Sequence, residues 1–333
     1  METILKLLSA NEKKTLASVR KLDEHPLLQL TYYGDYHFDD FLKQGAQNDK
    51  ELEAFLNKRL FKTYPINLDF KLGGCTVFVA RNELDEILFC RNFDFVYTPV
   101  LQLFTSPSQG YKSVSTTALK FYGYTENFLF TGINKDNIHL LGSPYIPCDG
   151  MNEKGLAIGF LYIPEIDYKK DDTKITLNST TMIRVILDKA STVKEAIELI
   201  KQYNVYFSAD ILCHYLLADA SGDSALVEYW NGGVQVLTTH DNYQIATNYI
   251  ACKPLNYEED WFEIERARTV ENSILESGGH LTNQQAIDLS VNVGGYIDGT
   301  DILQWTVIYN LTRKTGKIFA RRNIDNIINF QES

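Results

Sequence analysis

The sequence has few cysteines, no cysteine pair with metal-site spacing and no long apolar run. Its five cysteines are Cys75, Cys90, Cys148, Cys213 and Cys252, and none forms a CxxC motif. An odd, dispersed set of this kind excludes a disulfide framework and a cysteine zinc site. No apolar run approaches the roughly 18 residues of a membrane-spanning helix, so we expect no membrane span.

Basic residues are also scarce relative to acidic ones. The chain has 32 Lys and Arg against 43 Asp and Glu, giving a formal net charge of -11. This balance argues against a nucleic-acid partner, which normally meets a basic face. There is no Gly-rich phosphate loop and no metal motif, so we expect no cofactor and no metal. The first eight residues include an early acid and too short an apolar stretch for a signal peptide, which predicts a cytoplasmic location.

Residues 1–63 have a mainly helical pattern. Apolar residues keep a rough helical spacing from Ile4 to Leu22, and His25-Pro26 ends that pattern. A second helix is predicted from Asp49 to Lys62. Between the two, residues 27–33 have the composition of a strand.

From Gly73 onward the pattern changes to short apolar strands and turns. Residues 76–80 and 86–90 predict a β-hairpin, and residues 304–310 and 316–320 predict another near the end of the chain. Helices are predicted over residues 180–189, 192–202, 261–276 and 282–291. Many antiparallel strands with grouped helices indicate an α+β fold, most simply two sheets packed face to face with helices outside.

Cys75 stands out because of its neighbours. Gly73 and Gly74 precede it, and two glycines let the backbone adopt strained conformations that would expose the Gly74 carbonyl to attack. If the two hairpin strands pair, Arg91 and Asp94 return to the neighbourhood of Cys75, and a guanidinium beside a thiol lowers its pKa. The simpler interpretation, a buried strand cysteine near a surface ion pair, is favoured by composition alone.

A resemblance changes that balance. Gly74-Cys75-Thr76, with Arg91 sixteen and Asp94 nineteen residues after the cysteine, resembles the start of the mature chain in the choloylglycine hydrolase family. This family of N-terminal-nucleophile amidases includes bile-salt hydrolases, penicillin V acylases and N-acylethanolamine acid amidases, with acid ceramidase as a relative. Three further segments resemble family elements: Asp149–Leu156, Ala246–Tyr249 and Arg266–Thr269.

The resemblance implies an N-terminal-nucleophile (Ntn) hydrolase αββα sandwich and a role for each matching residue. Residues 1–74 would be a prosegment, cleaved at Gly74–Cys75, and residues 75–333 the catalytic domain. Cys75 would be the nucleophile, with its freed α-amine as base, while Arg91 and Asp94 would hold the thiolate and orient the amine. Asn152 and Asn248 would stabilise the oxyanion. Arg268 would support the site, with Arg266 as the competing candidate.

The implied reaction is hydrolysis of linear amides through a thioester, with fatty-acyl or bile-acid amides preferred over penicillin V. Phe95, Tyr97 and Tyr162 follow the motifs and are candidate pocket residues. Acyl transfer to an amine by the same thioester remains an alternative, as does an uncleaved protein that only binds lipid amides. Whether the prosegment stays bound and whether the chain forms a homo-oligomer are left open.

Several of these residues have simpler interpretations. Asn152 in an Asn-Glu-Lys-Gly turn suits a purely local role, and Asn248 alone could be an ordinary strand-end residue. None of the six histidines lies in a recognisable motif. Cys213 and His214 are adjacent, and in a strand their side chains would point to opposite faces, which makes them a poor catalytic dyad.

Overall fold

The computed structural model describes residues 6–61, 74–125, 128, 130, 132–134, 137–254, 256–258, 260–297 and 299–331. Two large sheets dominate these residues. The first has nine strands, antiparallel except where β2 runs parallel to β5. In spatial order they are β1 (Arg20–Asp23), β2 (Leu27–Thr31), β5 (Val100–Thr105), β6 (Ser113–Ala118), β7 (Asp149–Asn152), β8 (Ala157–Tyr162), β11 (Cys213–Ala218), β12 (Ser224–Trp230) and β13 (Gly233–Thr238).

The second sheet has seven strands and contains the predicted cysteine hairpin. Its order is β14 (Gln244–Ala246), β3 (Gly74–Asn82), β4 (Ile87–Asp94), β18 (Leu303–Asn310), β19 (Thr315–Ala320) and β20 (Ile328–Gln331), and β15 (His280–Leu281) also pairs with β3. Two small pairs complete the strands: β9 (Thr176–Asn178) with β10 (Asn204–Tyr206), and β16 (Tyr296–Ile297) with β17 (Thr300–Asp301).

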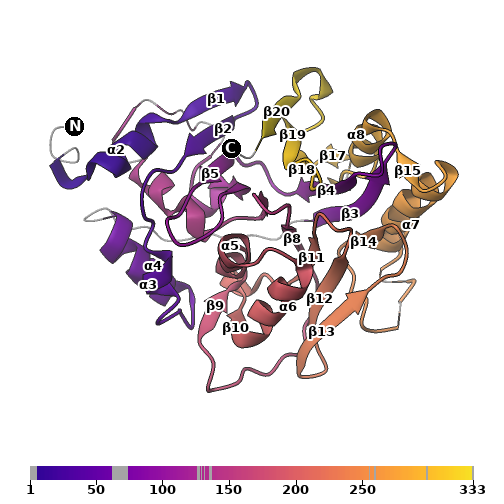
Figure 1. The fold of residues 1–333 in the computed structure, drawn as a ribbon, viewed down its shortest axis with the longest axis horizontal. Coiled ribbons are helices and arrows are strands. Elements are labelled where there is room, and N and C mark those ends of the chain that lie inside the picture. Colours follow the sequence, from indigo (N-terminus) through magenta and orange to yellow (C-terminus); the bar gives the residue numbers. More distant parts are fainter. Residues whose placement is uncertain are drawn as a thin grey trace.

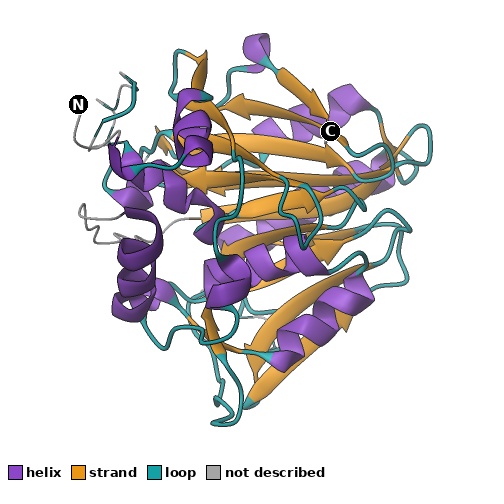
Figure 2. Ribbon diagram, turned by 60° about the vertical axis from the view of Figure 1, so that its left-hand side comes forward, coloured by secondary structure: helices purple, strands orange, loops and turns teal. Residues whose placement is uncertain are grey.

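Helices cover the outer faces of both sheets (Figure 1). α5 (Ser179–Lys189) and α6 (Val193–Gln202) pack on the nine-stranded sheet, whereas α7 (Trp261–Glu276) and α8 (Asn283–Asn292) pack on the seven-stranded one. Figure 2 shows the strands lying between these helices. Other α-helices in the described part of the chain include α2 (Ala10–Ala17), α3 (Phe38–Phe41) and α4 (Asp49–Leu56). α4 continues into a π-helical segment, Asn57–Phe61, and short 3-10 helices cover Leu119–Tyr122, Ile138–Tyr145, Ser208–Asp210 and Ile324–Asn326.

Apolar side chains fill two layers. The larger core joins the facing sides of the two sheets with the N-terminal helices, and it includes Leu16, Leu30 and Leu52. A smaller core packs Phe78 and Cys90 of the second sheet against α7 and α8. Residues 6–61 are therefore part of the same buried interior as the rest of the described chain.

The predicted helices and hairpins agree with these elements to within a few residues, with one correction near the N-terminus. Within the described part of the predicted helical stretch, residues 6–7 and α2 are helical, whereas residues 20–23 form β1. The Arg20 side chain binds Gln29, and Gln29 donates to Gln102 at 2.7 Å, so pairing with the sheet decides the conformation there. Lys62 and Gly73 lie outside the described residues. Within the described chain, no helix is both long enough and apolar enough to cross a bilayer.

Candidate active site

Cys75 is the second residue of β3, and its side chain lies between the two sheets. β3 pairs with β4 so that Gly74 faces Asp94 and Cys75 faces Phe93. The hairpin thus brings Arg91 and Asp94 to Cys75, as their spacing predicts. The thiol is 2% exposed.

The expected strain before Cys75 is not found at Gly74. Gly74 is part of the extended strand and has no positive φ. A Cβ added there would come no closer than 3.5 Å to its neighbours, Asn248 Oδ1 and Asp94 Cβ, which is ordinary contact. The expectation of a strained glycine is therefore wrong for Gly74.

Arg91 is completely buried and its guanidinium faces several oxygen atoms. Nη2 donates to the Phe160 carbonyl at 3.0 Å, Nη1 donates to the Asn92 carbonyl, and Nε lies 3.2 Å from Asp149 Oδ2. Asp149, which precedes the predicted turn, also accepts from the Tyr309 hydroxyl at 2.7 Å. These contacts fix Arg91 across the space between the two sheets.

The electrostatics of Cys75 differ from the sequence expectation. Burial raises the pKa of the Cys75 thiol, and Arg91 lowers it only in part. Asp94 acts in the same direction as burial, while Arg266 acts with Arg91. The neutral thiol is therefore the favoured form, and the expected depressed pKa is not found.

Asp94 is held by a backbone amide and by an arginine of α7. Its Oδ1 accepts from Gly295 N at 2.9 Å, and its Oδ2 accepts from Arg266 Nη2 at 2.5 Å. Arg266 also contacts Glu263 at 3.2 Å and the Val293 carbonyl at 3.1 Å, and its Nη2 donates to Thr76 Oγ1. Arg266 therefore links α7 and its neighbours to the strand that contains Cys75.

The choice of Arg268 as the supporting arginine is corrected by this geometry. Arg268 is half-exposed and pairs with Glu265 at 2.7 Å on the outer side of α7. The buried face of α7 repeats every four residues through Arg266, Val270 and Ile274. That helical period was present in the sequence and indicates Arg266.

Asn248 lies directly beside Cys75. Its Oδ1 accepts from the backbone N–H of Cys75 at 2.7 Å, and its Nδ2 donates to the Tyr162 carbonyl at 2.7 Å. Its own N–H donates to Glu263 Oε2 at 3.1 Å. Of the two predicted oxyanion asparagines, only this one contacts Cys75.

Asn152 has a different role from the one expected. Its Nδ2 donates to the carbonyls of Leu187 at 3.1 Å and Ala190 at 2.7 Å, and its Oδ1 accepts from the backbone N–H groups of Lys154 and Leu156. Both amide hydrogens are therefore used to attach the turn to the end of α5. No N–H of this side chain remains for an oxyanion, so the role predicted for Asn152 is contradicted in this conformation.

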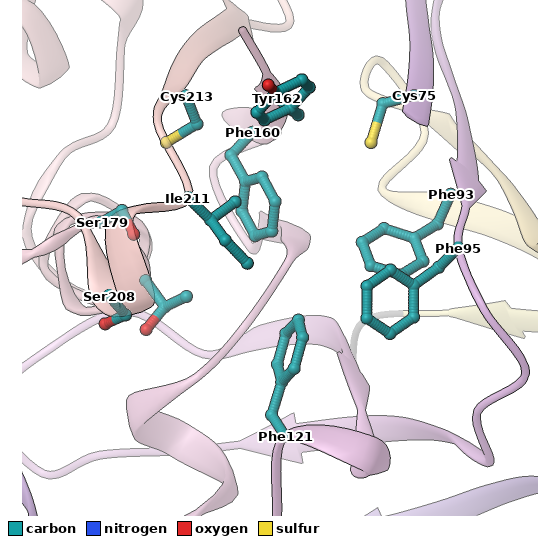
Figure 3. A pocket seen from close by; sticks show the side chains of 11 residues that line it. Cys75, Phe93, Phe95, Phe121, Phe160, Tyr162, Ser179, Ser208, Ile211 and Cys213 are labelled. Carbon is teal, nitrogen blue, oxygen red and sulfur yellow. The ribbon is translucent and has the colours of Figure 1, made fainter. Parts of the chain in front are cut away.

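The thiol lies on the wall of an apolar cavity (Figure 3). Figure 3 shows the Cys75 sulfur pointing toward the space framed by Phe93, Phe95 and Phe160. The free space between these rings is narrow. Its other lining residues come from four further segments: Phe121, Tyr162, Ser179, Thr180, Ser208, Ile211 and Cys213.

A second, more open cleft is adjacent, and Phe95 and Tyr162 line both spaces. Gly74, Asn248 and Arg266 line this cleft. Phe95 and Tyr162 are two of the three residues predicted to line a substrate pocket. Tyr97 lines neither space, and its ring instead lies 5.7 Å from the Arg321 guanidinium.

Several site residues carried no local sequence signal. Phe121 and Ile211 come from segments that only the tertiary fold brings together, and Asp149 lies in the predicted turn segment, whose sequence indicates no role for it. Among the described residues, no group of three His, Cys, Asp or Glu side chains has the arrangement of a metal site.

Comparison with known proteins supplies two partial sequence matches. The chain is 36% identical over 113 residues to a penicillin V acylase of Pectobacterium atrosepticum, covering 30% of this chain and 29% of that protein. It is 35% identical over 104 residues to an uncharacterised protein of Paramecium bursaria Chlorella virus 1, covering 28% of this chain and 36% of that one. The matches thus span about a third of the length of these relatives.

Solved structures of other proteins share the fold. A penicillin V acylase from Agrobacterium tumefaciens matches with a TM-score of 0.52 and 20% identity, over 74% of this chain and 83% of that one. A mutant conjugated bile acid hydrolase from Clostridium perfringens matches with a TM-score of 0.55 and 15% identity, over 77% and 92%. The fold is therefore the Ntn-hydrolase fold expected from the sequence. The model of the linear amide C-N hydrolases, choloylglycine hydrolase family, matches residues 75–268, more than half of the chain, and this protein belongs to that family.

Proposed function

We propose that this protein is an autoprocessing cysteine amidase that hydrolyses the linear amide bond of N-acyl compounds. The observation that carries the proposal is the position of Cys75. Cys75 lines an apolar cavity, Gly74 before it lines an open cleft, and Arg91, the Asp94–Arg266 pair and Asn248 lie around Cys75.

Activation would begin with attack of the Cys75 sulfur on the carbonyl carbon of Gly74. The peptide C–N bond breaks, the nitrogen gains a proton, and Gly74 becomes bonded to sulfur as a thioester. Water then cleaves the thioester, which leaves a carboxylate on Gly74 and a free α-amine on Cys75. Such an amine has an ordinary pKa of about 8, so it can act as a general base near neutral pH.

The surroundings of the Cys75 nitrogen suit this role. In the uncleaved chain its N–H already donates to Asn248 Oδ1 at 2.7 Å, and the amine formed on cleavage would keep that acceptor. The Asp94 carboxylate lies next to Gly74, across the strand pair. A negative charge there would favour the protonated amine that must later give its proton to the leaving group.

The packing of residues 6–61 supports retention of the prosegment after cleavage. β2 pairs with β5 along five residues, and Leu16, Leu30 and Leu52 are part of the main core. Cutting one peptide bond at Cys75 removes none of these contacts. We therefore propose that the two pieces remain associated.

In turnover the Cys75 sulfur would attack the substrate carbonyl, and the amine would take the thiol proton. The carbonyl oxygen would become negative and would receive an N–H from Asn248, whose Nδ2 has one hydrogen beyond the bond to Tyr162. The protonated amine would then protonate the leaving nitrogen as the C–N bond breaks. Water would hydrolyse the acyl-thioester and regenerate the thiol.

The apolar cavity sets the expected acyl group. The free space between its rings is narrow, so it suits a slender chain or a flat ring better than a bulky fused-ring system. The rings of Phe93, Phe121 and Phe160 provide an apolar lining, which favours medium-length fatty-acyl or aryl-acyl chains. We propose these over the larger steroid of a bile-acid amide.

Two measurements test the proposal together. Intact-mass analysis of the purified protein should show a fragment that begins at Cys75, and the variant Cys75→Ala should remain full length. A panel of octanoyl, phenylacetyl and cholyl p-nitroanilides should release p-nitroaniline with the wild type but not with the variant. Hydrolysis that persists in Cys75→Ala would overturn the assignment, and preference for the cholyl amide would overturn the size argument.

A further inference from the structure

A buried histidine lies behind the loop that contains Asn248. His214, on β11, is 0% exposed, and Cys213 beside it lines the apolar cavity. The two side chains point in different directions, as predicted for neighbouring strand residues. The His214 ring instead contacts Glu228 of β12 and the backbone of Thr247.

The two ring contacts define the charge of His214. Nε2 lies 3.0 Å from the Thr247 carbonyl oxygen, which can only accept, so Nε2 must have a hydrogen. Nδ1 lies 2.8 Å from Glu228 Oε1. A lone pair on Nδ1 would face the lone pairs of a carboxylate, so an ionised Glu228 requires a hydrogen on Nδ1 as well. Both nitrogens then donate, and the ring is an imidazolium.

The surroundings of Glu228 support its ionised form. Burial tends to raise the pKa of this carboxyl, but hydrogen bonds from His214 and from the next segment lower it below its usual value. The backbone N–H groups of Ala251 and Cys252 donate to its two oxygens at 2.9 and 2.8 Å. A carboxylate accepts both of these hydrogen bonds, whereas the O–H of a carboxylic acid would disturb one of them.

The ion pair therefore holds one short loop at both ends. His214 binds the loop at Thr247, Glu228 binds it at Ala251 and Cys252, and Asn248 lies between these points. The Asn248 amide is the group that contacts the Cys75 nitrogen and the Tyr162 carbonyl. The position of that amide thus depends on a charged pair outside the cavity.

We propose that His214 and Glu228 are positioning residues that fix the Asn248 amide for the reaction at Cys75. They touch no reacting atom and act through residues 247–252. This inference rests on the proposed function for its kinetic consequence, whereas its structural consequence needs no substrate. A misplacement of about 1 Å in a catalytic group can cost about 100-fold in rate, so a loop shift of that size should be visible.

The first test is NMR of the wild-type protein and of His214→Gln. With nitrogen-labelled histidine at neutral pH, both ring nitrogens of His214 should be protonated. The side-chain amide signal of Asn248, identified by its loss in Asn248→Ala, should shift in His214→Gln. It should not shift in Tyr36→Phe, which removes a different buried hydrogen bond, to Asp188 at 2.7 Å. A neutral His214 ring, or an unmoved Asn248 signal, would overturn the proposal without reference to activity.

The second test is a double-mutant cycle with phenylacetyl p-nitroanilide. His214→Gln should lower kcat about 10- to 100-fold with KM changed less than about threefold. In the Asn248→Ala background the same substitution should cost less than about threefold, because its effect passes through Asn248. Glu228→Gln should show the same loss of kcat and takes the place of His214→Gln if that variant folds poorly, and Tyr36→Phe should leave kcat unchanged. If the fold-losses in kcat of the two single variants multiplied in the double variant, the proposal would be overturned. If the wild type showed no turnover, that result would count against the proposed function, and the NMR result would still decide whether His214 and Glu228 position Asn248.

Discussion

Replacing Arg266 by alanine should harm this protein far more than replacing Arg268, two residues away on the same helix. Arg266 is 7% exposed and contacts Asp94, Glu263, Thr76 and the Val293 carbonyl. Asp94 is 0% exposed, so loss of the guanidinium leaves a buried carboxylate with only the Gly295 amide. Breaking a buried pair in this way typically costs about 3–5 kcal/mol.

The size of that loss is large enough for a clear measurement. At about 1.4 kcal/mol per factor of ten, the unfolding equilibrium constant should rise about 100- to several thousand-fold. Urea denaturation followed by circular dichroism measures it, and kcat for phenylacetyl p-nitroanilide should fall as well because Asp94 loses its orientation. Arg266→Lys should retain part of both, since an ammonium keeps the charge but cannot reach the separate acceptors that the planar guanidinium contacts.

Arg268→Ala is the matched control. Its side chain is solvated and pairs only with surface groups, Glu265 and the Tyr257 hydroxyl, so neither stability nor kcat should change measurably. If Arg268→Ala were as damaging as Arg266→Ala, or if Arg266→Ala had no effect on either quantity, the assignment of the Asp94 partner would be refuted.

Three further predictions follow from other contacts. Asn152→Ala should lose about 1–3 kcal/mol of unfolding free energy through unsatisfied backbone groups, with kcat/KM nearly unchanged; a large kcat loss at full stability would show that Asn152 takes part in the reaction. Arg91→Gln removes the charge that lowers the pKa of the Cys75 thiol, so the pH midpoint for alkylation of Cys75 by iodoacetamide should rise, and an unchanged or lower midpoint would contradict this reading. Ile211→Trp should fill part of the apolar cavity and reduce kcat/KM for octanoyl p-nitroanilide more than for acetyl p-nitroanilide, whereas equal reductions would place the acyl group elsewhere.

The core of the site could be predicted because it depends on one local element. A β-hairpin fixes which residues face each other, so a short turn between two apolar runs places Arg91 and Asp94 near Cys75. Arg266 could also have been found, because the apolar period of Val270 and Ile274 extends back to position 266. Similarity to a short family segment favoured Arg268 instead, and the buried helical face contradicts it.

Other parts of the site depend on contacts between distant segments, which no local pattern reveals. The approach of Asp149 to Arg91 joins the two sheets, and the cavity collects side chains such as Phe121 and Ile211 from separate connections. For Asn152 the local pattern is clear but is compatible with two roles. The same residue in the same turn could cap the turn or stabilise an oxyanion, and only the positions of the carbonyls of Leu187 and Ala190 decide between them.

The most direct test of the account is to identify the atom that carries the acyl group during turnover. The protein would be mixed with octanoyl p-nitroanilide, quenched with acid within the first turnover, digested and analysed by mass spectrometry. The account predicts an octanoyl group on a peptide that begins at Cys75, released by hydroxylamine as expected for a thioester. Turnover by a full-length chain, or an acyl group on any other residue, would contradict it.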